Sequence, residues 1–410
     1  MEKVKYLIIG GGVAGTTAAE TIRQLDPAGS CTIISDEPYR LYSRVMLSKP
    51  NFFLEKIPFD QIWLKQEDWY AKNNITLMAG RKATTLDTAA KTVTLDDGTN
   101  IAYDKLLLAT GASIRNWEVT GAEKQNVFYL HGLDDAKQII AKVKSAKRAV
   151  IVGGGFIGFE MCDMLRLAGI EVTLILRKPH FWDPVLDQHS GALIEAALER
   201  SGVKILRNSL VKEVVGNVAA QGVILHNDIM LPCDMIIVGI GTYCPFEWIK
   251  NAGIQVNRGI LANEYLATSA PDVWVAGDSA EFNDLILGEQ IQLGNWANAQ
   301  MQGKIAARAM CGEKTEFRLV SFYVTSGFGI TIAFAGNVRP AEGGVHITRD
   351  SADGNSLSRI IIKSGKIIGA TMINNTKELA VIAKLIEKSA NMENDKDKLS
   401  DPLFDLKTLL

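Results

Sequence analysis

Two glycine-rich stretches carry the residue spacing that could bind a dinucleotide. Each follows a short β-branched run and opens a segment of helical period, in "KYLIIGGGVAGTTAAETIRQL" from Lys5 and "RAVIVGGGFIGFEMCDMLRLAG" from Arg148. The spacing is GxGxxG in both stretches, with glycines at Gly10, Gly12, Gly15, Gly153, Gly155 and Gly158. Glycine is needed because the turn is tight and the backbone must approach a pyrophosphate closely, while the helix N-terminus offers unpaired N–H groups. The repeat therefore predicts two βαβ units with a dinucleotide site in each.

The residues that follow the second strand of each unit differ. Asp36 and Glu37 come after "CTIIS" in the first unit and can accept hydrogen bonds from ribose hydroxyls, whereas Arg177 and Lys178 come after "EVTLIL" in the second. An acid there holds the 2′-hydroxyl of NAD, and an arginine can meet the 2′-phosphate of NADP. The second site is therefore expected to favour NADPH slightly over NADH. The alternative is that Arg177 is only a solvent-exposed cation at a strand end.

The composition is that of an ordinary globular chain. Its 410 residues exceed what one core supports, and 47% of them are hydrophobic, so two or three domains are expected. The formal net charge is -2, so the chain lacks the overall positive charge that favours binding to nucleic acid or to an anionic membrane surface. The apolar run that opens the chain is too short to span a membrane and lacks a cleavage site, so no targeting segment is expected.

The cysteines indicate a reduced protein. They form no CxxC pair and have no metal-ligand spacing to the histidines, so no metal site is expected. The five positions are Cys31, Cys162, Cys233, Cys244 and Cys311. Because they are odd in number and widely separated, the simplest interpretation is a cytoplasmic protein with free thiols.

Hydrophobic periodicity predicts the elements that lie between the two units. Residues 57–74 have helical spacing and lead into a strand, "ITLMAG". Residues 91–111 indicate a hairpin that turns at Asp97–Gly98, followed by a buried strand. Further expected elements are an amphipathic helix over 133–144, a helix and a strand over 191–206, and a buried strand over 233–241.

The tail after about Phe317 changes character. The segments "GITIAFAG" and "RIIIKSGKIIGATMIN" are typical of antiparallel strands, with a turn at Ser364–Gly365. The segment "TKELAVIAKLIEKSA" is expected to form a helix capped by Thr376. The predicted fold class is α/β, with two Rossmann-like, doubly wound dinucleotide-binding domains and a small α+β C-terminal domain.

The order of these motifs resembles the FAD-dependent pyridine nucleotide-disulfide oxidoreductase superfamily. The marks are "IIGGGVAG", "LLLATGA", "VGGGFIGFE", "GIGTYCP" and "TSAPDVWVAGD", which together cover residues 5 to about 312. Within that superfamily, "YRLYSRVMLSK", "WYAKNNI", "AYDKLLLATGASIR" and "NWANAQMQG" are most similar to NAD(P)H:rubredoxin and ferredoxin reductases and to the NADH-oxidising part of nitrite reductases. The resemblance implies FAD in the first unit and NAD(P)H in the second, which is inserted into the first.

The resemblance also sets the expected domain boundaries. Residues 1–115 and 245–316 would form the FAD-binding domain, and residues 116–244 the NAD(P)-binding domain. Residues 317–410 would form an α+β cap over the flavin.

Site residues follow from the same resemblance. Gly10, Gly12, Ala14 and Gly15 would meet the FAD pyrophosphate. Asp36 or Glu37 would bind the ribose of FAD, and Asp278 the ribityl chain. The other positions assigned to cofactor binding are Val13, Ala83, Ala109, Thr110, Gly111, Arg115, Gly153, Gly155, Phe156, Ile157, Gly158, Arg177, Lys178, Gly241 and Gly277.

The segment "LYSRVMLSK" at residues 41–49 carries two cations expected near the flavin. Arg44 would pair with the pyrophosphate or lie beside the isoalloxazine, where negative charge develops on reduction. The resemblance implies that Lys49 lies near the flavin and forms a buried ion pair with Glu160, and both are assigned as catalytic. From residue type alone, Lys49 could be an exposed loop lysine and Glu160 a first-turn acid favoured by the helix dipole. Val45 replaces the proline usual in this group, which could loosen the loop.

Trp296, in "NWANAQ", would either flank the flavin or serve only in the core.

The electron acceptor is expected to be external. Disulfide-reducing members of the superfamily carry one or two cysteines in the segment 41–49, and here there are none. Cys31 and Cys162 are expected to be packing residues on a buried strand and inside a helix. Electrons would therefore pass to a small redox protein, a rubredoxin or ferredoxin, through a basic dock near the flavin edge.

Two alternatives stay open. Molecular oxygen could be the acceptor, which would make the chain an NAD(P)H oxidase. The chain could also be a coenzyme-responsive flavoprotein sensor or scaffold, in which coenzyme binding changes association. A homodimer is compatible with either interpretation.

Overall fold

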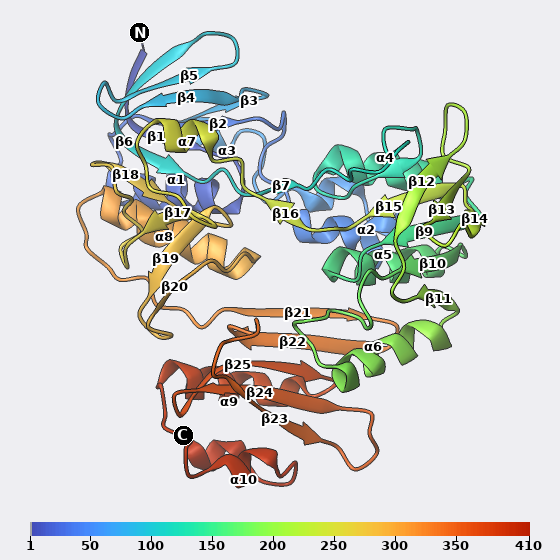
Figure 1. The fold of residues 1–410 in the computed structure, drawn as a ribbon. Coiled ribbons are helices and arrows are strands. Elements are labelled where there is room, and N and C mark those ends of the chain that lie inside the picture. Colours follow the sequence, from blue (N-terminus) through green and yellow to red (C-terminus); the bar gives the residue numbers. More distant parts are fainter. Residues whose placement is uncertain (1) are drawn as a thin grey trace.

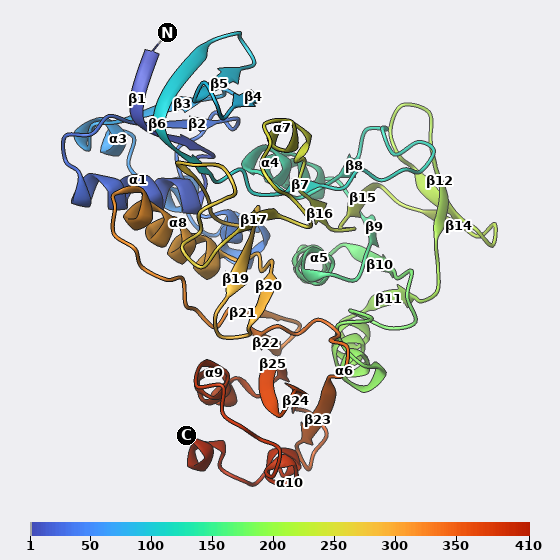
Figure 2. The same cartoon turned by 60° about the vertical axis from the view of Figure 1, so that its left-hand side comes forward.

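A computed structural model describes residues 2–410, so Met1 of the predicted first domain lies outside the described residues. Two α/β units lie side by side, and an antiparallel sheet lies below both of them (Figure 1). The same arrangement is visible after rotation, with helices α1 and α8 adjacent in the first unit (Figure 2). Among the described helices, none is both long enough and apolar enough to cross a membrane.

The first unit is built on a seven-stranded sheet in the order β3-β2-β1-β6-β5-β4, with β18 also paired to β6. Its strands are β1 (Glu2–Ile9), β2 (Cys31–Ser35), β3 (Ile75–Ala79), β4 (Ala83–Asp87), β5 (Thr92–Leu95), β6 (Asn100–Leu108) and β18 (Val273–Val275). Strands β1, β2, β3, β6 and β18 run parallel, whereas β5 pairs antiparallel with β4 and β6. The predicted hairpin at Asp97–Gly98 is therefore confirmed. Every residue of β2 is buried, as expected where helices cover both faces of a parallel sheet.

Helices α1 (Val13–Leu25) and α8 (Trp296–Met310) pack closely in the first unit, although residues 26–295 separate them in sequence. The contact depends on Gly303, because a Cβ there would lie 2.2 Å from the carbonyl oxygen of Ala14. Strand β18 and helix α8 thus return to the first sheet after the second unit is complete. The short helix α7 (Glu247–Asn251) and a small sheet lie on the returning segment. That small sheet consists of β17 (Ile260–Ala262), β19 (Ala280–Asp284) and β20 (Glu289–Ile291).

The second unit repeats the parallel arrangement on a smaller scale. Its sheet has the order β11-β10-β9-β15-β8, with every pair parallel. The strands are β8 (Val127–Phe128), β9 (Arg148–Val152), β10 (Glu171–Ile175), β11 (Val203–Leu206) and β15 (Met235–Val238), and the helices are α4 (Leu133–Val143), α5 (Phe156–Leu167) and α6 (Gln188–Arg200). A three-stranded antiparallel sheet of β12 (Val211–Val215), β13 (Gly222–Leu225) and β14 (Met230–Pro232) flanks it. The two segments that join the units pair as β7 (Ser113–Ile114) and β16 (Thr242–Tyr243).

The tail forms a five-stranded antiparallel sheet in the order β21-β22-β25-β24-β23. Its elements are β21 (Phe322–Gly327), β22 (Ile330–Gly336), β23 (Val345–Asp350), β24 (Leu357–Lys363), β25 (Lys366–Ile373), α9 (Leu379–Glu387) and α10 (Lys396–Ser400). The predicted turn at Ser364–Gly365 joins β24 and β25. The buried Arg349 fixes the last turns of the chain by donating to the carbonyl oxygens of Lys398, Leu399 and Phe404 and to Glu378.

Two expectations about local structure are wrong. Residues 57–74 do not form one helix but a 3-10 turn, η2 (Phe59–Ile62), and one helical turn, α3 (Trp69–Lys72). The chain leaves the helical path because Trp63 forms a β-bridge with Tyr42 and packs its ring 6.3 Å from that of the tyrosine.

Thr376 does not cap a helix. It begins a 3-10 turn, η3 (Thr376–Glu378), and α9 starts only at Leu379 without a side-chain cap. The preceding residue, Asn375, donates its side-chain amide to Ser358 at 2.9 Å, so the polar side chain at this position is used to join the turn to β24.

Candidate active site

The first glycine turn forms an open cradle at the N-terminus of α1. Gly10 has φ +117°, and a Cβ there would lie 2.0 Å from the carbonyl oxygen of Ala109. A Cβ on Gly15 would lie 1.9 Å from the oxygen of Gly10, so the helix packs tightly against the turn. Gly12 is different, because a Cβ there would meet no atom within 4 Å. Gly12 is also the N-cap and supplies no side-chain cap, which leaves the first N–H groups of α1 open to an anion.

The carboxyl ends of β6 and β18 lie beside this cradle. The N–H of Ala109 donates to the carbonyl oxygen of Ile9 at 2.7 Å, and Thr110 and Gly111 continue from there. Gly277 follows β18, and its N–H donates to the buried side chain of Gln302 at 2.8 Å. Gln302 is a residue that the sequence did not suggest.

Asp278 supplies a carboxylate with no protein partner in the described part of the chain. Burial raises its pKa, although Arg44 and His131 are near enough to offset part of that rise. A Cβ on Gly294 would lie 3.0 Å from the Asp278 carboxylate, so glycine keeps the approach to it clear. A half-buried acid without a donor is costly, and a bound hydroxyl group would relieve that cost.

The cations and acids at the end of β2 pair with each other. Glu37 Oε1 accepts from Arg44 Nη2 at 2.9 Å and from the hydroxyl of Tyr42 at 3.2 Å. Arg44 also donates to the carbonyl oxygen of His131. Asp36 is exposed beside them. The assigned contacts of Arg44 with pyrophosphate and of these acids with ribose stay predictions, since the structure shows only the pairing of Arg44 with Glu37.

The second glycine turn has the same geometry as the first. Gly153 has φ +110°, and a Cβ there would lie 2.2 Å from the carbonyl oxygen of Gly239. A Cβ on Gly158 would lie 2.0 Å from the oxygen of Gly153. Gly155, the N-cap of α5, again faces open space within 4 Å and has no side-chain cap. The two open turns have the form that two pyrophosphates require.

The first residue of α5 joins the second turn to the C-terminal sheet. The ring of Phe156 lies 4.4 Å from that of Tyr323 and 4.5 Å from that of Trp182, both edge to face. The next residue is Ile157, and a Cβ on Gly239 would lie 3.5 Å from the Ile157 Cβ. Their assignment to coenzyme binding stays a prediction.

At the end of β10 the two cations are exposed. Lys178 Nζ lies 3.4 Å from Asp183 Oδ2, whereas Arg177 makes no hydrogen bond or ion pair with the described residues. Leu176 is buried beneath them. Arg177 is therefore free to meet a group bound at the second turn.

An ion pair joins the two units. Lys49, which follows the 3-10 helix η1 (Arg44–Ser48), places Nζ 2.5 Å from Glu160 Oε1 on α5. Only 5% of the Glu160 side chain and 30% of the Lys49 side chain are exposed. The pairing expected from the resemblance is thus present, and its role in catalysis stays a prediction.

The remaining assigned residues lie on three different segments of the chain. The N–H of Arg115 donates to the carbonyl oxygen of Gly241 at 3.1 Å, next to the antiparallel pair of β7 and β16 that joins the two units. Trp296 is the half-buried first residue of α8. Ala83 is buried; it begins β4 and pairs with Leu95.

Sequence reasoning missed three residues that hold Glu160. Ser48 donates to Glu160 Oε2, Thr325 donates to Oε1 at 2.7 Å, and Tyr323 donates to Oε1 at 3.1 Å. Burial, together with Glu160, raises the pKa of the Tyr323 hydroxyl. A signal was present, because polar residues at alternate positions of "FYVTSG" point to one face of a strand.

All five cysteines are unpaired, and none lies in residues 41–49. Burial raises the pKa of the thiols of Cys31 and Cys233 to about 12. Cys162 is fully buried in α5, as expected for a packing residue. Cys244 is half-buried, and burial raises its pKa to about 11. Such thiols are poor nucleophiles at neutral pH.

Comparison with known proteins identifies the family. Residues 4–303 match the family model described as pyridine nucleotide-disulphide oxidoreductase, and residues 325–410 match the one described as reductase C-terminal. The chain belongs to the pyridine nucleotide-disulphide oxidoreductase family.

Individual members of the family match over most of their length. The chain is 31% identical over 98% of its length to the biphenyl dioxygenase system ferredoxin–NAD(+) reductase component of Paraburkholderia xenovorans, covering 97% of that protein. It is 33% identical over 75% of its length to the rubredoxin–NAD(+) reductase of Pseudomonas putida, covering 80% of that protein. Among solved structures, the covalent putidaredoxin reductase–putidaredoxin complex matches with a TM-score of 0.92, 26% identity, and coverage of 100% of this chain and 98% of that one.

Pyridine nucleotide-disulphide oxidoreductases use FAD and NAD(P)H, and the residues of this member fit both groups. Two glycine cradles stand open at helix N-termini, and the unpartnered carboxylate of Asp278 lies beside the first of them. The protein is therefore an NAD(P)H-dependent flavoprotein reductase.

Proposed function

We propose that the chain transfers electrons from a nicotinamide dinucleotide to a small electron-carrier protein, a rubredoxin or a ferredoxin. The observation that carries this proposal is the ion pair of Lys49 with the buried Glu160, 2.5 Å apart, between the two dinucleotide units. The absence of cysteine from residues 41–49 supports an external acceptor rather than a disulfide. The names of the two curated relatives, a ferredoxin reductase and a rubredoxin reductase, support the class of carrier.

The residues of the chain would bind and orient the reacting groups. FAD, when bound, supplies hydride acceptance from NAD(P)H and release of the electrons to the carrier. The glycine turns would hold the two pyrophosphates, and Asp278 would accept a hydrogen bond from a ribityl hydroxyl. Lys49 would place a fixed positive charge beside the site where negative charge develops, and Glu160 would keep that cation in place.

We propose the domain roles on the same grounds. Residues 1–115 and 245–316 would bind FAD, residues 116–244 would bind the coenzyme, and residues 317–410 would cover the site. The unpaired thiols support a reducing compartment such as the cytoplasm. A homodimer stays part of the proposal, and sedimentation velocity of the purified protein would detect it.

An anaerobic titration tests the function. The purified protein should be yellow, lose its flavin absorbance when NADH or NADPH is added, and regain it when oxidised rubredoxin or ferredoxin follows. Lys49→Met should slow the first step, whereas Lys56→Met, an exposed lysine seven residues later, should not. A colourless protein that takes up no flavin would refute the proposal. Fast reoxidation by oxygen alone would favour the oxidase, and reoxidation by no carrier would favour the sensor.

We infer that NADPH is the preferred coenzyme. Arg177 is exposed at the end of β10 and has no hydrogen-bond or ion-pair partner within residues 2–410, and no acid follows Leu176 to hold a 2′-hydroxyl. The relatives' names point to NAD(+), so NADH is the competing assignment. Arg177→Ala should lower kcat/KM for NADPH by about fivefold, the value of one exposed charge contact, and leave that for NADH unchanged. Arg200→Ala, an exposed arginine at the end of α6, is the control. An unchanged coenzyme preference in Arg177→Ala would refute the inference.

A further inference from the structure

Strand β21 of the C-terminal sheet reaches the ion pair between the two dinucleotide units. Glu160 Oε1 accepts from Lys49 Nζ at 2.5 Å, from Thr325 Oγ1 at 2.7 Å and from the Tyr323 hydroxyl at 3.1 Å. Ser48 donates to the other oxygen. Two of the four donors therefore come from a strand that is more than 160 positions away in the sequence.

We propose that Tyr323 and Thr325 are positioning residues for Lys49, and that β21 is a working part of the site where the nicotinamide dinucleotide is oxidised. The proposal rests on the proposed function for the role of Lys49. The two residues act through Glu160, whose carboxylate they fix in one orientation. Neither is assigned a contact with the reacting groups.

The side chains of Tyr323 and Thr325 point in the same direction from β21. Tyr323 and Thr325 are two positions apart on β21, so they point to the same face of the sheet. The ring of Tyr323 is also fixed, because it packs edge to face against Phe156 at 4.4 Å. Phe156 begins α5, the helix that carries Glu160. The phenol and the carboxylate therefore belong to one packed unit.

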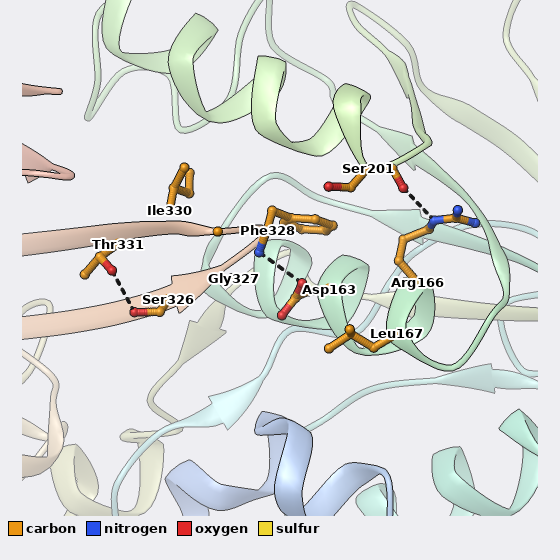
Figure 3. A pocket seen from close by; sticks show the side chains of 10 residues that line it. Asp163, Arg166, Leu167, Ser201, Ser326, Gly327, Phe328, Ile330 and Thr331 are labelled. Carbon is orange, nitrogen blue, oxygen red and sulfur yellow. Dashed lines mark hydrogen bonds between the residues drawn. The ribbon is translucent and has the colours of Figure 1, made fainter. Parts of the chain in front are cut away.

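A second carboxylate on α5 holds the tip of the same hairpin. Asp163 lies one turn after Glu160, and its Oδ1 accepts from the N–H of Phe328 at 3.0 Å, between β21 and β22 (Figure 3). A Cβ on Gly327 would lie 3.2 Å from the Asp163 carboxyl carbon, so the approach is as close as glycine permits. A cleft of about 690 Å³ lies along the outer side of this contact. Two acids of one helix therefore hold the hairpin at two points, one on β21 and one in the turn after it, so β21 cannot slide along α5 without breaking both contacts.

The electrostatic reason for the arrangement is the burial of Glu160. A carboxylate with 5% exposure has lost nearly all its water, and one ammonium group cannot satisfy both its oxygens. Lys49 is 30% exposed and has water as an alternative partner. Loss of an uncharged donor would let the carboxylate turn, and the ammonium would then no longer be held in one place.

The test uses variants of the flavin-loaded protein and a matched control. Thr325→Val removes the hydroxyl at nearly constant volume, Thr325→Ser retains it, and Tyr323→Phe removes the phenol oxygen but keeps the ring. Thr331→Val is the control, because the Thr331 hydroxyl lies on the same hairpin and pairs with Ser326 at 3.1 Å instead of with Glu160. In anaerobic stopped flow, the limiting rate of flavin reduction should fall about 30-fold in Thr325→Val, the value of one hydrogen bond to a charged group. The coenzyme dissociation constant should stay within about twofold, because the coenzyme itself loses no contact.

A second measurement needs neither flavin nor coenzyme. Competitive acetylation of the flavin-free protein, followed by mass spectrometry, reports how freely Lys49 reacts. Labelling of Lys49 should rise severalfold in Thr325→Val and Tyr323→Phe, and return toward wild type in Thr325→Ser. Thr331→Val should match wild type in both measurements.

The outcomes separate this proposal from the proposed function. Wild-type reduction rates and Lys49 labelling in both Thr325→Val and Tyr323→Phe would overturn the positioning role. If Thr325→Val does not fold, Tyr323→Phe and Thr325→Ser decide the question by the same criteria. If the wild-type protein is not reduced by either coenzyme, the proposed function fails, and the labelling results still accept or reject the role of β21 in holding Lys49.

Discussion

Replacement of Lys49 by methionine should show how much the uncharged hydrogen-bond donors around Glu160 reduce the free-energy cost of burying its carboxylate. Breaking a buried ion pair by removing one partner costs about 3–5 kcal/mol when the remaining charge has no other support. Here Ser48, Tyr323 and Thr325 still donate to the carboxylate. The loss should then be that of one hydrogen bond to a charged group, about 2 kcal/mol. A loss of that size lowers the folding equilibrium constant about 30-fold.

The assay is urea denaturation of the flavin-free protein, combined with a second substitution. In the wild-type background, Glu160→Gln should destabilise the protein, because it leaves Lys49 without its partner. In the Lys49→Met background the same change should restore about 1 kcal/mol, because it removes a buried charge that has lost its counterion. The sign of the Glu160→Gln effect is therefore expected to reverse between the two backgrounds. Lys56→Met, at an exposed position, serves as the control for loss of a lysine.

The reasoning would be refuted if Glu160→Gln destabilised both backgrounds equally. A loss of more than about 4 kcal/mol in Lys49→Met would show that the three uncharged donors do not support the carboxylate. The denaturant slope must be the same in all variants, since a chain of several units can unfold in more than one step.

Three further predictions concern the packing and the ionisation of the fold. Gly303→Ala should lower the free energy of unfolding by about 1–3 kcal/mol, because its Cβ would lie 2.2 Å from the oxygen of Ala14; thermal denaturation measures this, and an unchanged melting temperature would contradict it. Arg349→Met should cost about 3 kcal/mol in urea denaturation, since it leaves Glu378, whose side chain is 12% exposed, without its cation, and a loss below 1 kcal/mol would argue against that role. Burial lowers the pKa of His131, so the unfolded chain takes up the imidazole proton at a higher pH than the folded chain does, and the free energy of unfolding should fall as the pH drops through about 6.5. In His131→Gln that part of the fall should disappear, and urea midpoints measured across this pH range would show it.

The sequence predicted those parts of the molecule that depend on neighbouring residues. The glycine turns at Gly10 and Gly153 require positive φ, and glycine at that spacing is enough to predict this backbone conformation. The hairpin at Asp97–Gly98 is likewise a local pattern. The contact of Lys49 with Glu160 spans 111 positions and was expected from the resemblance to known reductases, not from the chemistry of the two residues alone.

The parts that sequence reasoning missed depend on distant segments. Residues 57–74 have helical spacing, but the bridge between Tyr42 and Trp63 draws the chain out of a helix. The alternation of Tyr323 and Thr325 indicates a polar face of the strand, but it does not show that this face meets Glu160, because that contact depends on how the C-terminal sheet packs against α5. Tertiary packing overrode the local preference in the first case and created the contact in the second.

The return of β18 and α8 to the first sheet sets an order of events at the ribosome. When residues up to 240 have emerged, the second unit holds all five strands of its parallel sheet and can close. The first sheet still lacks Val273–Val275, so one side of Leu106–Leu108 has no partner strand. The nascent chain therefore carries an apolar, unpaired strand edge through the synthesis of the whole inserted unit. Such an edge is a template for aggregation, and a chaperone that shields it would act on this protein between those two points of translation.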